Sequence, residues 1–75
     1  NNIMKKIAIK LEYKDKTFIS EYDNYSEEEE AALIDLLEKA AKGELSCLKF
    51  KSGNIHHFFS SHVLSESILG IVYSD

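Results

Sequence analysis

The chain has 75 residues and a formal net charge of -4, with 44% apolar and 29% charged residues. This length suits one domain, residues 1–75, and the composition is typical of folded proteins and not of disordered chains. The single cysteine excludes an internal disulfide, no apolar run approaches the ~20 residues that span a bilayer, and no signal peptide is visible, so we expect a cytoplasmic protein.

The N-terminal segment is predicted to form a β-hairpin. Apolar and charged residues alternate from Ile3 to Tyr13, which is the period of a half-buried strand. Residues 14–16 suit a turn, and residues 17–22 are typical of the returning strand. The pattern breaks at residues 23–25.

Met4 resembles a natural start, so residues 1–3 are interpreted as leader residues.

A helix is predicted over residues 27–42. Ser26 and Glu29 have the spacing of a capping box, and four consecutive glutamates fill the first turn, where the helix dipole favours anions. Gly43 is placed to end the helix in a left-handed conformation. The expected apolar stripe comprises Leu33, Leu36, Leu37, Ala40 and Ala41.

Three further strands are predicted, over residues 45–51, 55–60 and 68–73, with a single helical turn in 61–66. The last strand is apolar almost throughout, which favours a central position in the sheet or cover on both of its faces. The order β-β-α-β-β-β then gives a two-layer α+β domain with a mostly antiparallel sheet and one amphipathic helix. The uncovered face of this sheet is expected to carry Lys6, Lys10, Lys49, Lys51 and His57.

The histidines, serines and cysteine, which often serve in metal or catalytic sites, lack the neighbouring residues that such sites need. His56 and His57 are adjacent on a strand and point to opposite faces, and no acid or cysteine lies close by to complete a metal site with His62. Ser60, Ser61 and His62 have no G-x-S-x-G motif beside them. Cys47 is expected to pack inertly. We therefore expect no enzyme, with no catalytic, cofactor-binding or metal-binding residues.

The charge distribution indicates a protein partner. All nine cationic residues are lysines, and an acidic chain without arginine is unsuited to direct binding of nucleic acid. Residues 21–38 contain eight acids and no base. Such a face could dock onto a basic groove, such as the channel of a nucleic-acid-handling host protein. The residues predicted to bind are Glu27, Glu28, Glu30 and Asp35 by charge, with Tyr22 and Tyr25 as anchors.

Two alternatives stay open. The glutamates could serve only the helix dipole and its solvation. The protein could also be a homo-oligomeric structural or regulatory accessory, whose uncovered sheet face or edge strand pairs with a second copy. Salt dependence distinguishes docking onto a basic partner from self-association, because charge-driven docking weakens as salt rises and apolar self-association does not.

The C-terminal half carries a resemblance. Residues 43–50 (Gly-Glu-Leu-Ser-Cys-Leu-Lys-Phe), a hairpin, and residues 63–71 (Val-Leu-Ser-Glu-Ser-Ile-Leu-Gly-Ile) resemble small uncharacterised proteins of phages and prophages of low-GC Gram-positive bacteria. The resemblance brings no catalytic residues and implies an intracellular product of a mobile element. Some proteins of this kind are virion or regulatory accessories, and others block host defences. The small size, acidity and α+β form are also similar to several anti-CRISPR and related anti-defence inhibitors, which include inhibitors of host enzymes.

Overall fold

A computed structural model describes residues 3–75 and has the α+β fold that the sequence predicts. Two of the three residues interpreted as leader residues, Asn1 and Asn2, lie outside the described residues. The elements in chain order are β1 (Lys5–Tyr13), β2 (Lys16–Ile19), β3 (Asp23–Tyr25), α1 (Glu27–Ala41), β4 (Cys47–Ser52), β5 (Ile55–Ser60), α2 (Ser61–Ser65) and β6 (Ile68–Tyr73).

The strand that returns from the first turn is longer than predicted, because a bulge divides it into β2 and β3. The β2 register pairs Lys10 with Ile19, whereas the β3 register pairs Lys5 with Tyr25, so one extra residue lies between the two ladders. At the bulge the Ser20 N–H donates to the Ile9 carbonyl at 2.9 Å, and the Ile9 N–H donates to Ser20 Oγ at 2.8 Å. The extra residue shifts the alternation of side chains, which is why residues 23–25 look like a break in the sequence.

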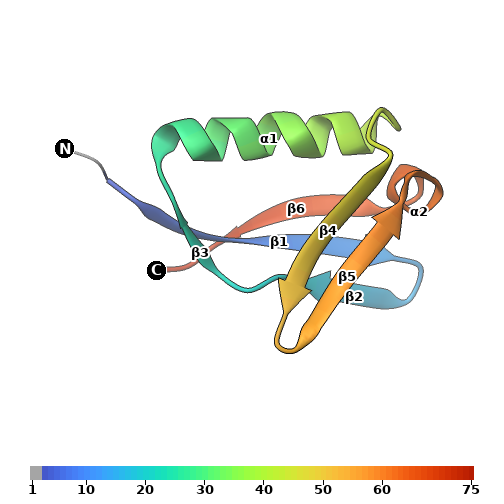
Figure 1. The fold of residues 1–75 in the computed structure, drawn as a ribbon, viewed down its shortest axis with the longest axis horizontal. Coiled ribbons are helices and arrows are strands. Elements are labelled where there is room, and N and C mark those ends of the chain that lie inside the picture. The colour runs from blue at the N-terminus through green and yellow to red at the C-terminus, as the bar shows by residue number, and fades with distance from the viewer. Residues whose placement is uncertain (1–2) are drawn as a thin grey trace.

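β1 is the central strand of the first sheet, and β6 lies at its edge. β1 pairs antiparallel with β2 and β3 on one side and with β6 on the other (Figure 1). The predicted central position of residues 68–73 is therefore wrong. Leu69 and Ile71 pack against the core, but Ile68 at the start of the strand is 69% exposed, so the apolar sequence does not reflect cover on both faces.

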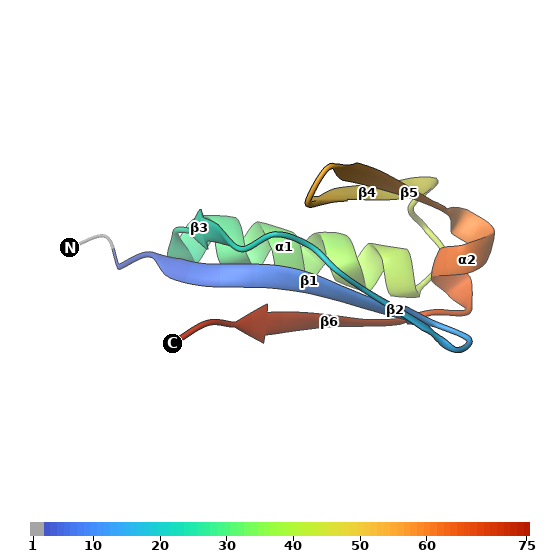
Figure 2. The same ribbon diagram turned by 90° about the horizontal axis from the view of Figure 1, so that it is seen from below.

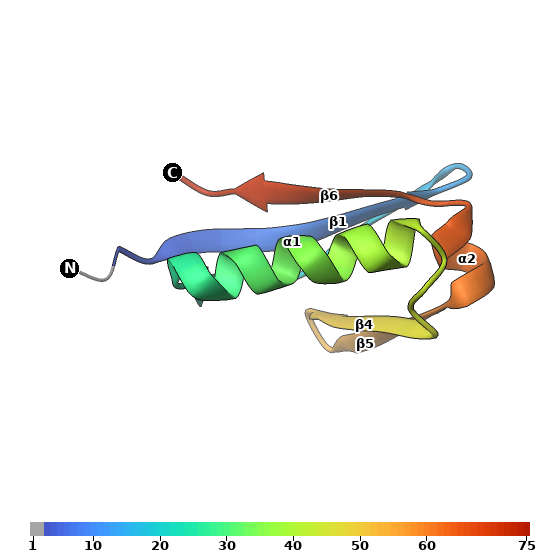
Figure 3. The same cartoon turned by 90° about the horizontal axis from the view of Figure 1, so that it is seen from above.

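β4 and β5 form a separate two-stranded sheet, and not the continuation of one sheet that the sequence suggests. Figures 2 and 3 show this hairpin and α1 on the same side of the sheet that contains β1 and β6. The smallest dimension of the molecule is 17 Å, which suits two layers. Of the lysines expected on one uncovered face, Lys6 and Lys10 lie on the first sheet, and Lys49 and Lys51 lie on the outer face of the hairpin.

The core lies between these two layers. Alternate residues of β1 form its floor, and α1 contributes Leu33, Leu37 and Ala40. Leu36 and Ala41, which were predicted to belong to the buried stripe, are exposed because the contact face of α1 is narrower than the sequence stripe. The buried cluster comprises Ile7, Ile9, Leu11, Leu33, Leu37, Ala40, Leu48, Phe50, Phe59 and Leu64.

The ends of the helices follow the predicted local signals. Gly43 adopts a φ of +75° after α1, which is the left-handed conformation that glycine tolerates best. α2 is the predicted single turn in residues 61–66, and Ser60 is its N-cap. In the described part of the chain, neither helix is long and apolar enough to cross a membrane.

The hairpin contributes one face to the core and leaves the other face in solvent. Phe59 is 6% exposed, while the adjacent Phe58 is 66% exposed, so the two rings point to opposite sides of the hairpin. His57 also points inward, against the expectation of an uncovered face, and its ring lies 5.2 Å from that of Phe18 and 5.8 Å from that of Phe50. The edge-to-face contact with Phe18 joins the hairpin to β2.

The two phenylalanines provide a matched test of this arrangement. Phe59→Ala should lower the free energy of unfolding by about 3–5 kcal/mol, because it leaves a cavity in the core. Phe58→Ala should change it by less than about 0.5 kcal/mol, because the ring is largely in solvent. Urea denaturation measures both values, and equal losses would contradict the assigned orientation of the hairpin.

Candidate protein-binding surface

The predicted cap positions the acidic end of α1. The Glu29 N–H donates to Ser26 Oγ at 3.1 Å, and the Glu29 carboxylate accepts the Ser26 N–H at 2.8 Å. This reciprocal pair is the capping box expected from the sequence. It occupies Glu29 and fixes the direction in which the neighbouring glutamates leave the helix.

Three of the predicted binding carboxylates point into solvent. Glu27, Glu28 and Asp35 are exposed, and Asp35 follows Glu28 by seven residues, which places both on the same side of the helix. No ion pair involves any of these three among the described residues. We call this set, Glu27, Glu28 and Asp35, the acidic face. Its charge is therefore available to a partner.

Glu30, the fourth predicted carboxylate, points inward and is 9% exposed. One of its oxygens accepts a hydrogen bond from Lys5 Nζ at 3.0 Å, and the other accepts one from the Tyr73 hydroxyl. Lys5 belongs to β1 and Tyr73 to β6, so one carboxylate joins the helix to two strands of the first sheet. Glu30 thus joins α1 to the first sheet and does not belong to the acidic face.

The electrostatics of this Glu30 cluster (Glu30, Lys5 and Tyr73) follow from its hydrogen bonds. The bond from Tyr73 and then that from Lys5 lower the pKa of Glu30 below its ordinary value of 4.5. The same carboxylate raises the pKa of Lys5 above 10.5 and that of Tyr73 above 10.0, because it stabilises their protonated forms. At neutral pH the cluster is an ion pair with a neutral phenol.

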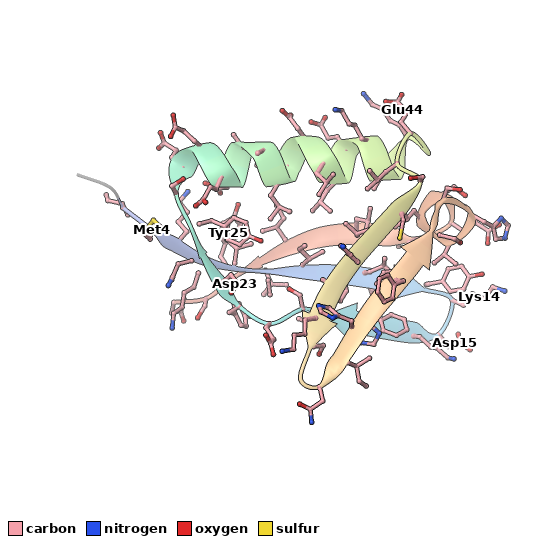
Figure 4. The ribbon with its side chains drawn as sticks, in the orientation of Figure 1. Met4, Lys14, Asp15, Asp23, Tyr25 and Glu44 are labelled. Atoms are coloured by element: carbon pink, nitrogen blue, oxygen red, sulfur yellow. The ribbon has the colours of Figure 1, made fainter. Side chains whose placement is uncertain are left out.

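The two tyrosines predicted as anchors differ in their surroundings. Tyr22 lies between β2 and β3 and is 46% exposed. Tyr25 is partly buried and packs against the core, and Figure 4 shows it beneath the N-terminal end of α1. Burial, with Asp23 and Glu29 nearby, raises the pKa of Tyr25. Of the two, Tyr22 is the more accessible to a partner.

The histidines and the cysteine are dispersed. In residues 3–75, no group of three or more histidine, cysteine or acidic side chains is arranged to hold a metal ion. His62 lies beside Glu66, with Nε2 at 3.9 Å from the carboxylate. Cys47 is exposed, contrary to the expectation of inert packing, because it lies on the outer face of the hairpin.

Two apolar depressions were missed by the sequence analysis. One, of about 390 Å³, lies where the β1–β2 turn meets β5 and α2, and its apolar lining includes Tyr13, Phe18 and Val63. The other, of about 350 Å³, lies between α1 and β6. The second had a signal in the sequence, since Ile34 falls beside the buried stripe and residues 68–73 carry no charge.

Comparison of the chain with protein-family models, with curated proteins and with solved structures finds no match. The resemblance of the C-terminal half to phage proteins therefore stays a prediction. The function of the protein is therefore inferred from the geometry of its surfaces.

The Glu30 cluster predicts a pH-dependent stability. Because the pKa of Glu30 is lower in the folded than in the unfolded chain, the charged carboxylate stabilises the fold above pH 4.5, and this contribution is lost as the pH falls through the folded-state pKa. Glu30→Gln should be less stable than the wild type at pH 7, and the difference should shrink as the pH is lowered. Denaturation series across this range measure it.

Glu28→Gln is the matched control, because it removes the same charge from the same helical turn without touching Lys5 or Tyr73. Its effect on stability should be smaller at pH 7. Equal losses in the two variants would contradict a special role for the Glu30 cluster.

Proposed function

We propose that this protein is a small non-enzymatic protein-binding module that docks through the acidic face of α1 onto a basic surface of a larger partner. One observation carries the proposal: Glu27, Glu28 and Asp35 are exposed and have no ion-pair partner among the described residues. Neighbouring carboxylates that share one side of a helix repel one another. A complementary cationic surface relieves that repulsion and speeds association.

The rigidity of the helix supports this role. The capping box fixes the first turn of α1, and the Glu30 cluster ties that turn to β1 and β6. A preorganised surface loses little conformational entropy when it binds. Tyr22, which precedes β3, is the proposed aromatic anchor, and Tyr25 supports the helix from beneath.

The proposed partner is a nucleic-acid-handling protein of the host. A channel that binds the phosphate backbone is lined with cationic side chains, so an acidic face can occupy it in place of nucleic acid. The resemblance of the C-terminal half to phage and prophage proteins favours a mobile-element inhibitor of a host enzyme or defence system. Such an inhibitor would act in the cytoplasm.

The test is a pull-down with tagged protein from a lysate of a low-GC Gram-positive bacterium, at low and at high salt. The wild type should retain a specific partner at low salt and release it at high salt. The triple variant Glu27→Gln, Glu28→Gln, Asp35→Asn should lose the partner even at low salt, with binding weakened by about tenfold or more.

A second triple variant, Glu44→Gln, Glu66→Gln, Asp75→Asn, is the control. It removes the same number of charges from exposed positions away from the acidic face. It should retain the partner. If both triple variants lost the partner equally, the loss would follow from the change in net charge, and the assignment of the binding site to the acidic face would be overturned.

A further inference from the structure

The outer face of the β4–β5 hairpin is exposed along its whole length. Leu48, Phe50 and Phe59 point inward and are buried in the core. The six outward residues are all exposed, and Figure 2 shows the hairpin along one side of the molecule and β6 along the other. Across the two strands the outward residues pair as Cys47 with Ser60, Lys49 with Phe58, and Lys51 with His56.

The two strands carry different chemistry on this face. β5 contributes the rings of His56 and Phe58, whose centroids lie 6.3 Å apart. β4 contributes two ammonium groups, from Lys51 opposite His56 and from Lys49 opposite Phe58. Opposed residues of an antiparallel pair have Cβ atoms about 4.5–5.5 Å apart, so each ring has a lysine beside it. We call Lys49, Lys51, His56 and Phe58 the hairpin face.

The charge of the hairpin face is not compensated within the described part of the chain. Neither lysine forms an ion pair among residues 3–75, and none of the six outward residues is an acid. Residues 21–38 hold eight of the thirteen acids. The net charge alone predicts no direct binding of nucleic acid, but the structure separates that charge by surface, and the local potential decides which ligands each surface attracts.

The exposed ring of Phe58 is held on a rigid support. A phenylalanine ring that is 66% exposed forgoes most of the free energy that burial provides. The strands beneath it are anchored in the core by Leu48 and Phe59. The Glu21 N–H also donates to the Lys51 carbonyl at 2.9 Å, which ties β4 to the segment between β2 and β3. Such a platform loses little conformational entropy when a ligand binds.

We propose that the hairpin face binds a single-stranded nucleic acid, with two successive bases stacked on His56 and Phe58 and the adjoining phosphates beside Lys51 and Lys49. Aromatic side chains stack on any base, because every base has a π face. Successive bases of a duplex strand lie about 3.4 Å apart along the axis. The rings are 6.3 Å apart, so neighbouring bases reach both of them only in an unstacked strand.

The pairing of each ring with a lysine favours a nucleic acid over an acidic peptide. An acidic peptide would bind the lysines and leave the two rings without partners. A nucleotide joins a planar base to an anionic phosphate, and the hairpin face repeats the complementary combination twice. Bidentate readout of guanine edges typically uses arginine, which this chain lacks, so binding is expected to tolerate different sequences.

The hairpin face and the acidic face are separate surfaces, and binding of nucleic acid does not depend on the proposed function. The acidic face belongs to α1, whereas the hairpin face belongs to β4 and β5. The acidic-face triple variant should still bind a single strand, and Phe58→Ala should still retain the protein partner. Failure of either proposal leaves the other standing.

The first experiment is a fluorescence-anisotropy titration of a labelled oligothymidylate of about eight nucleotides with the whole chain. At about 50 mM salt the wild type should bind with a dissociation constant on the order of 10⁻⁴–10⁻⁶ M. A duplex of the same length should bind about tenfold more weakly, because its bases are not free to stack on the rings. An oligouridylate of the same length distinguishes RNA from DNA as the ligand, and binding of either supports the proposal.

Three results would overturn the proposal. The first is no binding of either single strand at protein concentrations up to about 1 mM. The second is equal affinity for the duplex. The third is displacement of the single strand by polyglutamate at the same concentration of charge, which would assign the hairpin face to an acidic peptide.

Phe58→Ala tests the stacking. It should raise the dissociation constant about fivefold or more, whereas Phe58→Tyr, which keeps a ring, should bind nearly as the wild type does. Ile55→Ala is the control, because Ile55 is another exposed apolar residue of β5 but lies in the inward row with Phe59. Equal weakening by Phe58→Ala and Ile55→Ala would contradict the site. Far-ultraviolet circular dichroism checks that each variant is folded.

The salt dependence of binding tests the lysines. Two phosphate contacts on a single strand predict a slope of about -1.4 when the logarithm of the binding constant is plotted against that of the salt concentration. Lys49→Gln should reduce the slope to about -0.7, because one contact is lost. Lys39→Gln removes the same charge from α1 and should leave the slope unchanged. Equal slopes for these two variants would place the phosphates elsewhere and overturn the site.

Discussion

The first sheet depends on β1, because every backbone ladder in it includes this strand. β1 pairs with β2, β3 and β6, and Ile7, Ile9 and Leu11 on its inner face form the floor of the core. Its alternation of apolar and charged residues decides which face α1 and the β4–β5 hairpin cover. A shift of one residue in β1 would expose that floor and turn Lys6 and Lys10 inward.

The helix is held to this strand by both packing and charge. Leu33, Leu37 and Ala40 pack on the core, while Glu30 binds Lys5 of β1 and Tyr73 of β6. The run of glutamates thus has three separate roles. Glu29 closes the cap, Glu30 joins the layers, and Glu27 and Glu28 remain charged in solvent. Because successive residues of a helix are rotated by about 100°, the four consecutive glutamates point in different directions.

Two surfaces beside α1 differ in physical character. The acidic face has charge without apolar cover, which suits fast and salt-sensitive docking. The depression between α1 and β6 is mainly apolar, with Ile34, Leu69 and Ile71 among its lining residues.

The sequence by itself determined the local elements. Ser26 with Glu29 specified the start of α1, Gly43 specified its end, and the alternations in residues 5–13 and 55–60 specified strands, because caps and periodicities act between near neighbours in the chain. Only the tertiary structure decided that residues 23–25 form a strand beyond a bulge, that β6 lies at an edge, and that Glu30 leaves the acidic run. These features depend on which distant residues meet, such as Glu30 with Tyr73, and sequence spacing does not contain that information.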